Sequence, residues 1–388
     1  AGFVDSMRNF KSQIQKATLD GFEFFIKRDD LLGDYLGGNK ARKLEFFVKN
    51  AHKFERNLRI ISYGSSQSNA LAALSVFARI NNFALIFVCE KISNFLKQNP
   101  CGNYAFALQN GAQIVENSRF SSRREMALNL CEEKDIFIEE GVACKEAQWG
   151  FKTLADEIKM QSKEMKRKFD IFLPAGTGAS ALYLAKFSEF RVFTCACVGD
   201  EGYLKRQMLA LEPNFDIKII DKKSDLRAIL SPNTALNLPP FFAKKYPNLA
   251  LNLLTFLQGA KTCFFELKNS LFRVKNSLLR AKKSPFQAKN LFENPANSPL
   301  CPKQKPQIFI LKTPRKFHFA KPYKELLSIY QRALEQTGIE FSLLYDGVGL
   351  RTMLFYRDIF TRKVLYIHQG GTRGNASLLK RYKFKHLL

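Results

Sequence analysis

One lysine in this chain stands where it could act as a covalent anchor. Lys40 belongs to the run GGNKARKLE (residues 37–45). Apolar residues at helical spacing from Leu44 to Ala51 predict a helix that begins near Asn39. Lys40 would then lie in its first turn, where unpaired backbone N–H groups and the helix dipole lower the pKa of an amine. A neutral amine can bond to an aldehyde cofactor and then act as a base. From this motif alone, a solvated lysine beside a glycine turn is an equally good interpretation.

A second motif supplies a hydroxyl and an amide. The run SSQSN (residues 65–69) directly follows an expected strand and opens an expected helix. The side chains of Ser68 and Asn69 should therefore point into the same cleft as Lys40, at the end of that strand. Considered alone, Ser68 is better explained as a helix N-cap.

A third motif could hold an anion. The run PAGTGASA (residues 174–181) again joins a strand to a helix. Its small residues let backbone N–H groups converge on an oxyanion, and hydroxyl groups add further bonds. The segment is therefore a candidate phosphate cup, formed by Thr177, Gly178, Ala179 and Ser180.

The elements around these motifs alternate between strand and helix, which predicts parallel sheets with helices on their faces. In open sheets of this kind, ligands sit at the carboxyl ends of the strands, where the three motifs fall. We expect strands at residues 59–63, 84–89, 113–115, 136–139 and 170–173, and helices at residues 68–80, 103–109, 123–131 and 145–160.

Composition sets wider limits. A chain of 388 residues with 46% hydrophobic content can bury a sizeable core, in two domains or in one large one. Its longest apolar stretches fall far short of the roughly 20 residues that a membrane span needs, and no secretory signal is evident, so we expect a cytoplasmic protein. The eight cysteines include no C-x-x-C pair, which favours reduced thiols over a disulfide framework and predicts no metal site.

The net charge of +26 is unevenly distributed. Residues 241–320 hold fifteen Lys or Arg against two acids, which gives +13, half of the total. Within them, residues 268–273 (KNSLFR) recur as residues 275–280 (KNSLLR), and apolar residues at 3,4 spacing predict a basic amphipathic helix. We expect a basic insertion at residues 222–315, packed on its host domain with solvated lysines. Binding to an acidic partner, nucleic acid or a membrane surface is the alternative.

These motifs, in this order, resemble those of the 1-aminocyclopropane-1-carboxylate deaminase and D-cysteine desulfhydrase family of pyridoxal-phosphate enzymes. The resemblance runs over residues 22–219 and 318–371 and implies the tryptophan synthase β-like fold, fold type II. It implies a small α/β domain at residues 50–165, and a large cofactor domain made of residues 1–49 and 166–388 that carries the basic insertion.

The resemblance also implies roles for individual residues. Lys40 would bind pyridoxal 5'-phosphate covalently, Ser68 would be a catalytic nucleophile or hydroxyl, and Asn69 would bond the ring hydroxyl of the cofactor. Residues 177–180 match the phosphate loop of the family. The runs LLYD (residues 343–346) and YIHQGG (residues 366–371) match two motifs that close the site around the pyridine ring.

The chain departs from the family pattern at three positions. Ala70 replaces the usual His after the Ser-Asn pair. Gly349 and Leu350 stand where the family often has Tyr and Glu, which serve substrate contact and the pyridine nitrogen in the deaminase. This disfavours the opening of 1-aminocyclopropane-1-carboxylate, a substrate without an α-hydrogen. Thr352 or Thr372 could offer the nitrogen a weaker hydroxyl partner.

Two neighbours of Lys40 carry charge of their own. Arg42 and Lys43 are expected to be ordinary solvated helix residues. The alternative is that Arg42 helps to neutralise the phosphate.

The expected activity is β-elimination from a small amino acid, with D-cysteine as the leading substrate and pyruvate, ammonia and sulfide as products. The first alternative is the 1-aminocyclopropane-1-carboxylate deaminase, which gives 2-oxobutanoate and ammonia. The second is a degenerate cofactor-binding protein whose basic insertion binds an acidic partner or nucleic acid. A homodimer is implied by the family only, and nucleic acid is not the expected partner.

Overall fold

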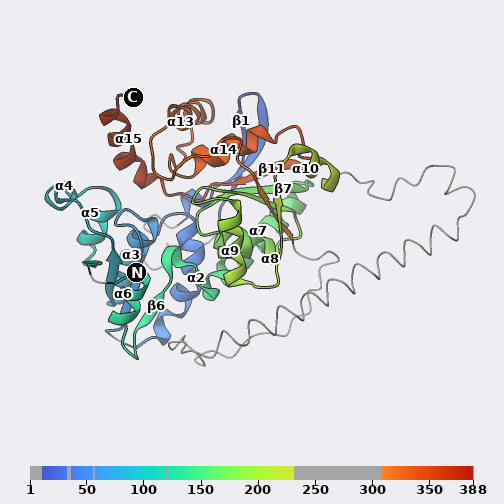
Figure 1. Ribbon diagram of the computed structural model, residues 1–388. Helices are drawn as coiled ribbons and strands as arrows, with labels where there is room; N and C mark the ends of the chain where they lie inside the picture. The colour runs from blue at the N-terminus through green and yellow to red at the C-terminus, as the bar shows by residue number, and fades with distance from the viewer. Residues whose placement is uncertain (1–10, 33–35, 56, 119, 231–306, 388) are drawn as a thin grey trace, which may run out of the picture. The chain divides into compact units, whose positions relative to one another are not determined.

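The computed structural model describes residues 11–32, 36–55, 57–118, 120–230 and 307–387. Strands and helices alternate along them and form two separate sheets with helices around them (Figure 1). The α/β class predicted from the sequence is confirmed.

The larger sheet has seven strands in the order β1-β2-β11-β7-β8-β10-β9. β1 and β2 form an antiparallel hairpin, whereas all other neighbours in this sheet are parallel. All residues of β7 are buried, as expected for a strand covered on both faces. The strands are β1 Ile14–Leu19, β2 Phe22–Lys27, β7 Phe169–Ala175, β8 Val192–Ala196, β9 Asp216–Ile220, β10 Gln307–Leu311 and β11 Lys363–Ile367.

The smaller sheet has four parallel strands in the order β5-β4-β3-β6. Two of them, β3 and β4, have the bounds that the sequence predicts, because each is a short apolar run between polar or turn-forming residues. The strands are β3 Arg59–Tyr63, β4 Ala84–Cys89, β5 Gln113–Glu116 and β6 Ile136–Ile138.

Helices cover both sheets, and α2 lies between the two cores (Figure 1). Leu44 and Phe47 of α2 pack into the core around α3, while α7 and α8 contribute to the core of the larger sheet. The helices are α2 Asn39–Asn50, α3 Asn69–Asn81, α4 Asn94–Gln98, α5 Gly102–Gln109, α6 Arg123–Leu130, α7 Gln148–Glu164, α8 Ala179–Phe187, α9 Glu201–Leu211, α10 Lys223–Leu230, α13 Lys324–Thr337, α14 Asp346–Phe355 and α15 Asn375–Phe384.

The expected division into domains stays a prediction. The four-stranded sheet falls within residues 50–165, and every strand of the seven-stranded sheet falls outside them. The insertion expected at residues 222–315 differs at its end, since Gln307–Leu311 forms β10, a mostly buried strand between β8 and β9. The prediction included this short apolar strand in the insertion because it lies at the edge of a basic, proline-rich stretch. The repeated basic segment at 268–280 lies outside the described residues.

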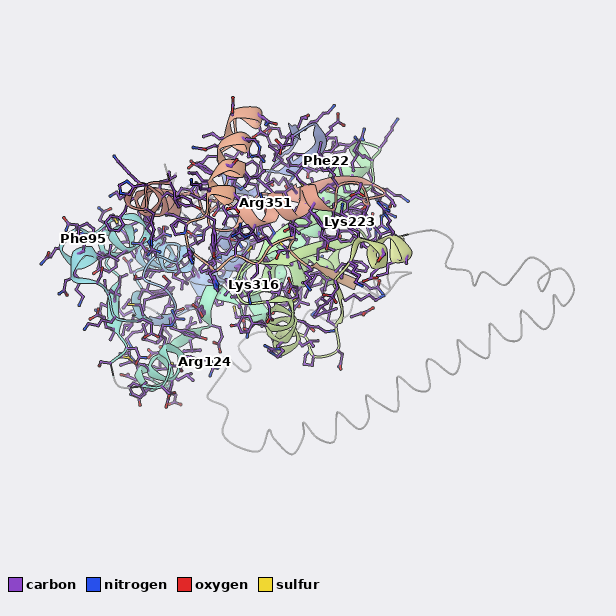
Figure 2. All side chains as sticks on the ribbon, turned by 45° about the horizontal axis from the view of Figure 1, so that its top comes forward. Phe22, Phe95, Arg124, Lys223, Lys316 and Arg351 are labelled. Carbon is purple, nitrogen blue, oxygen red and sulfur yellow. The ribbon has the colours of Figure 1, made fainter. Side chains whose placement is uncertain are left out.

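Two further expectations concern the surface and the thiols. Figure 2 shows Phe95 of α4 and Arg124 of α6 on the outer side of the region around the smaller sheet. Within the described ranges, no helix is both long and apolar enough to cross a membrane. The six cysteines in those ranges are all free, and Cys89, Cys195 and Cys197 are buried.

Candidate functional site

A cleft with about 600 Å³ of solvent-open space lies where β7 and β11 end and α2 begins. The loops after these parallel strands converge there, as the topology of open sheets predicts. Its lining comes from all the motifs that the sequence singles out: Asn39, Lys40, Lys43, Asn69, Gly141, Pro174, Ala175, Gly176, Thr177, Gly178, Ser180, Ala181, Tyr345, Asp346, Gln369 and Gly370.

The start of α2 is held against the segment that follows β11. Gly38 caps the helix with φ +55°, and a Cβ on it would lie 2.0 Å from the Gln369 carbonyl oxygen, so only glycine fits. The backbone N–H of Asn39 donates to that same oxygen over 2.9 Å. Lys40 therefore starts from a fixed backbone position.

The Lys40 amine is half-buried and projects into the cleft. Its Nζ donates to Asn39 Oδ1 over 3.2 Å. Burial lowers the pKa of Lys40 to about 8. The sequence predicts a lowered pKa from the helix terminus, whereas in the folded protein the loss of solvent is the cause. A large neutral fraction of this amine is present at mildly alkaline pH.

Asn39 links the lysine to the candidate phosphate cup. Its Nδ2 donates to Ser180 Oγ over 3.1 Å and to Gln369 Oε1 over 3.2 Å. Because Ser180 Oγ accepts this bond, its own proton is left for another acceptor. The first turns of α2 and α8 are thus joined across the cleft.

The cup itself forms at the start of α8. Gly178 caps this helix with φ +83°, and the residues around it present the free N–H groups of a helix N-terminus. Thr177, Gly178 and Ser180 line the cleft as the sequence predicts. Ala179 is fully buried in the first helical turn and is not among the residues that line the cleft. An anion such as a phosphate fits this arrangement.

Ser68 and Asn69 have different surroundings. Asn69 lines the cleft. Ser68 is the N-cap of α3, and its Oγ accepts a hydrogen bond from Leu71 N over 3.1 Å. The capping interpretation of Ser68 is therefore confirmed, and its catalytic role stays a prediction.

The expectation for Arg42 and Lys43 was wrong, because both are buried. Arg42 is 0% exposed and forms ion pairs with Asp29 and Glu157, so its charge is used inside the fold and not at the phosphate cup. Lys43 lines the cleft, and its Nζ donates to the Gly141 carbonyl oxygen over 2.7 Å. Burial, with Lys40 nearby, holds the pKa of Lys43 well below its usual value. The sequence pattern of the helix did not predict this burial, because Arg42 and Lys43 are charged residues of a type usually found on an exposed face.

A buried acid stands at the start of α14. Asp346 lines the cleft and accepts hydrogen bonds from Tyr366 Oη over 2.6 Å and from Ser342 N over 2.8 Å. Burial raises the pKa of this carboxyl. A Cβ on Gly349 would lie 2.5 Å from Tyr366 Oη, so the tyrosine hydroxyl fills the space that a side chain at position 349 would need.

Neither threonine considered for the pyridine nitrogen lines the cleft. Thr352 is fully buried, and its Oγ1 donates to the Val348 carbonyl of its own helix over 2.8 Å. Thr372 opens the 3-10 turn before α15.

One aromatic residue of the cleft had no assigned role in the sequence. Tyr345 lies against the loop before α8, where a Cβ on Gly176 would be 3.2 Å from its Cε1 atom. Burial raises the pKa of the phenol, which keeps it a hydrogen-bond donor at physiological pH. Its position directly before Asp346 in the LLYD run was the sequence feature that could have indicated a place in the cleft.

The donor set of this cleft fits a phosphorylated aldehyde. The N-terminus of α8 suits the phosphate charge, and Lys40 has the lowered pKa that bonding to an aldehyde requires. Among the described residues, no group of three or more His, Cys, Asp or Glu side chains is arranged to hold a metal ion.

Comparison with known proteins points the same way. Residues 12–199 match the sequence profile of a family described as "Pyridoxal-phosphate dependent enzyme". A bifunctional D-cysteine desulfhydrase/1-aminocyclopropane-1-carboxylate deaminase, mitochondrial, of Arabidopsis thaliana is 30% identical over 179 residues, which make up 42% of this chain and 44% of that protein. The aligned segment thus spans less than half the length of this relative.

Solved structures extend the similarity to the whole fold. The crystal structure of an ACC deaminase homologue matches with a TM-score of 0.61 at 19% identity and covers 98% of this chain and 95% of that chain. A fungal L-serine ammonia-lyase from Rhizomucor miehei matches with a TM-score of 0.55 at 14% identity, over 96% and 98% of the two chains. At these identities the likeness establishes the fold alone, and it confirms the expected fold type.

Proposed function

Residues 12–199 belong to the pyridoxal-phosphate dependent enzyme family, and from this premise we propose that the protein is a lyase that converts D-cysteine and water to pyruvate, ammonia and sulfide. Membership confirms the expected cofactor, pyridoxal 5'-phosphate. One observation carries the proposal: the Lys40 amine, with a pKa of about 8, shares a cleft with the anion-binding start of α8. The name of the Arabidopsis relative, which includes D-cysteine desulfhydrase, supports a small amino acid as substrate.

When bound, pyridoxal phosphate supplies an aldehyde that bonds to amines and a ring that accepts electron density from the substrate α-carbon. Thr177 and Ser180, with the backbone N–H groups at the start of α8, would hold the phosphate. Lys40 Nζ would hold the aldehyde. With substrate bound, the neutral Lys40 Nζ would be the base that takes the α-proton.

The remaining groups orient the substrate and the ring. The Asn69 amide would bind the hydroxyl oxygen on the ring of the cofactor. Ser68 Oγ accepts the capping bond from Leu71 N and keeps its own proton, which it can donate to the substrate carboxylate. The phenol of Tyr345, which also lines the cleft, could donate a further hydrogen bond. The thiolate leaves from the β-carbon, and water completes hydrolysis to pyruvate and ammonia.

The test is a titration of the purified protein with D-cysteine, followed by visible absorption and by assays of pyruvate and sulfide. Wild-type protein should carry the absorption band of covalently bound cofactor and release both products. The Lys40→Ala variant should do neither. Lys49→Ala, an exposed lysine on the same helix, is the matched control and should behave as wild type. A wild-type protein that binds no pyridoxal phosphate would refute the proposal.

A second candidate is the opening of 1-aminocyclopropane-1-carboxylate to 2-oxobutanoate and ammonia, which the name of the Arabidopsis relative includes. This substrate lacks an α-hydrogen, so Lys40 could not start the reaction by taking one. The contacts at Gly349 leave no room for the larger side chain that the resemblance calls for. Production of 2-oxobutanoate at a rate comparable to that of pyruvate would favour this second function.

Two coarser proposals accompany the function. The family resemblance supports a homodimer, which sedimentation of the purified protein tests. The free cysteines among the described residues support residence in a reducing compartment such as the cytoplasm.

A further inference from the structure

A fully buried amide holds the Asn69 side chain from behind. Asn103, in the first turn of α5, is 0% exposed and is not among the residues that line the cleft. It contacts the serine-asparagine motif through three hydrogen bonds, to Gln67 and Asn69. Its influence on a ligand must therefore pass through those two residues.

Backbone groups fix the orientation of the Gln67 and Asn103 amides. Gln67 Nε2 donates to the Cys101 carbonyl over 3.0 Å, so Gln67 Oε1 is the atom that accepts from Asn103 N over 3.0 Å. Asn103 Nδ2 lies 2.9 Å from the Gln67 carbonyl oxygen. Because a carbonyl can only accept, the amide nitrogen of Asn103 has to be on this side.

The orientation of Asn69 follows from that of Asn103. The second hydrogen on Asn103 Nδ2 points to Asn69 Oδ1 over 2.9 Å, so that oxygen is turned toward Asn103. The Asn69 Nδ2 atom is turned the other way, toward Gly371, where a Cβ would lie only 2.5 Å from it. Gly371 directly follows the cleft-lining Gly370. Asn69 can thus offer a ligand hydrogen-bond donors but no acceptor.

One polar atom of Asn103 has no partner. Within the described part of the chain, its Oδ1 atom is buried without a hydrogen bond, which costs free energy. The start of α5 packs tightly against Gln67, since a Cβ on Gly102 would lie 2.6 Å from Gln67 Oε1. Both amide hydrogens of Asn103 donate, one to the Gln67 carbonyl and one to Asn69 Oδ1.

We propose that Asn103 is a positioning residue that fixes Asn69 as a donor, so that this wall of the cleft selects a ligand oxygen that carries no proton. The inference rests on the proposed function. In pyridoxal phosphate the oxygen concerned belongs to the hydroxyl group on the ring, which exists with or without its proton. A donor that cannot accept stabilises the ionised form, and hence lowers the pH at which the bound cofactor loses that proton.

The test is a pH titration of the visible absorption of the bound cofactor in the intact holoprotein. In Asn103→Asp, a carboxylate of the same shape can no longer donate to Asn69 Oδ1, and the Asn69 amide should rotate to place its oxygen in the cleft. The titration midpoint should rise by about one pH unit or more. Asn103→Leu removes the donors without adding charge and should shift the midpoint in the same direction. Asn99→Asp, at an exposed position before α5, is the matched control and should not shift it.

The outcomes separate this inference from the proposed function. A shift in Asn103→Leu, with no shift in the control, supports the positioning role. A wild-type holoprotein with normal cofactor, together with an unshifted midpoint in Asn103→Leu, would overturn the inference alone, because a shift in Asn103→Asp only would reflect the added charge. A wild-type protein without bound cofactor would overturn both.

Discussion

The protonation of Lys40 should control how fast the protein captures its cofactor. Burial lowers the pKa of this amine to about 8, and only the neutral form bonds to an aldehyde. The rate at which cofactor-free protein captures pyridoxal phosphate should therefore rise about tenfold per pH unit below the pKa and level off above it. Absorbance after rapid mixing measures the rate, and equal rates about one unit below and above the pKa would contradict the assignment.

Gly178 should matter for more than its backbone conformation. It has φ +83°, and a Cβ on it would lie 2.8 Å from both Leu204 Cδ1 and Met208 Cγ. Gly178→Ala should lower the free energy of unfolding by about 2–4 kcal/mol and weaken cofactor binding, because the start of α8 has to move.

Gly338 provides the control for this change. It has a similar φ of +67° but nothing within 4 Å of the added Cβ. Gly338→Ala should cost about 1 kcal/mol and leave cofactor affinity unchanged. Urea unfolding and cofactor titration measure both quantities, and equal effects at the two glycines would show that only backbone strain is involved.

At the scale of elements, a buried ion network joins β2, α2 and α7. Arg42 on α2 bonds Asp29, which follows β2, and Glu157 on α7, while Lys27 at the end of β2 reaches the same Glu157. Burial raises the pKa of Asp29, but the Arg42 guanidinium outweighs this and holds the pKa below its usual value. The network therefore sets the position of the helix that carries Lys40.

Breaking this network should be costly. Arg42→Met removes the cation that pairs with the buried Asp29 and leaves Glu157 paired with Lys27, so it should lower the free energy of unfolding by about 3–5 kcal/mol in urea at neutral pH. Arg124→Met removes a more exposed ion pair with Glu139 and should cost about 0–1 kcal/mol. Similar losses in the two variants would mean that the buried pairs contribute no more than surface ones.

The elements also show what the sequence can predict. Short apolar runs between turn residues located β3 and β4 to the residue, whereas the helix expected at 145–160 is α7, Gln148–Glu164. Its first residues form a 3-10 turn, and its last turn is polar, so hydrophobic spacing gave no signal there.

The site was predictable only where a residue type has a characteristic place in a motif. Lys40, Asn69 and Thr177 line the cleft as the motifs indicate. Arg42 was misjudged because its partner on α7 is more than a hundred residues away in the chain. Asn103 gave no signal, since a buried asparagine at a helix start looks the same in sequence as an exposed one.

At the scale of the whole molecule, the concentration of positive charge in one segment can be tested by deleting that segment. Because β10 begins at Gln307, the removable segment is residues 231–306, and a cut extended to residue 315 would take a strand out of the larger sheet. Replacing 231–306 by a flexible linker should leave cofactor binding intact. Loss of cofactor binding in this variant would show that the basic segment belongs to the catalytic fold.

The same variant tests the nucleic-acid alternative. Binding of the full chain to duplex DNA that weakens with salt and disappears in the deletion variant would favour it. We expect no such difference, and fluorescence anisotropy at two salt concentrations measures it.

The part of the cleft that follows β11 is made very late in synthesis. β11 pairs between β2 and β7, and Gln369, which bonds the start of α2, lies 330 positions after Asn39. On a ribosome, the anchoring lysine emerges early, long before the strand that completes its surroundings. A nascent or prematurely terminated chain would expose this amine to free aldehyde without the cleft to retain it. Retention of the cofactor is therefore expected only once translation has passed residue 370.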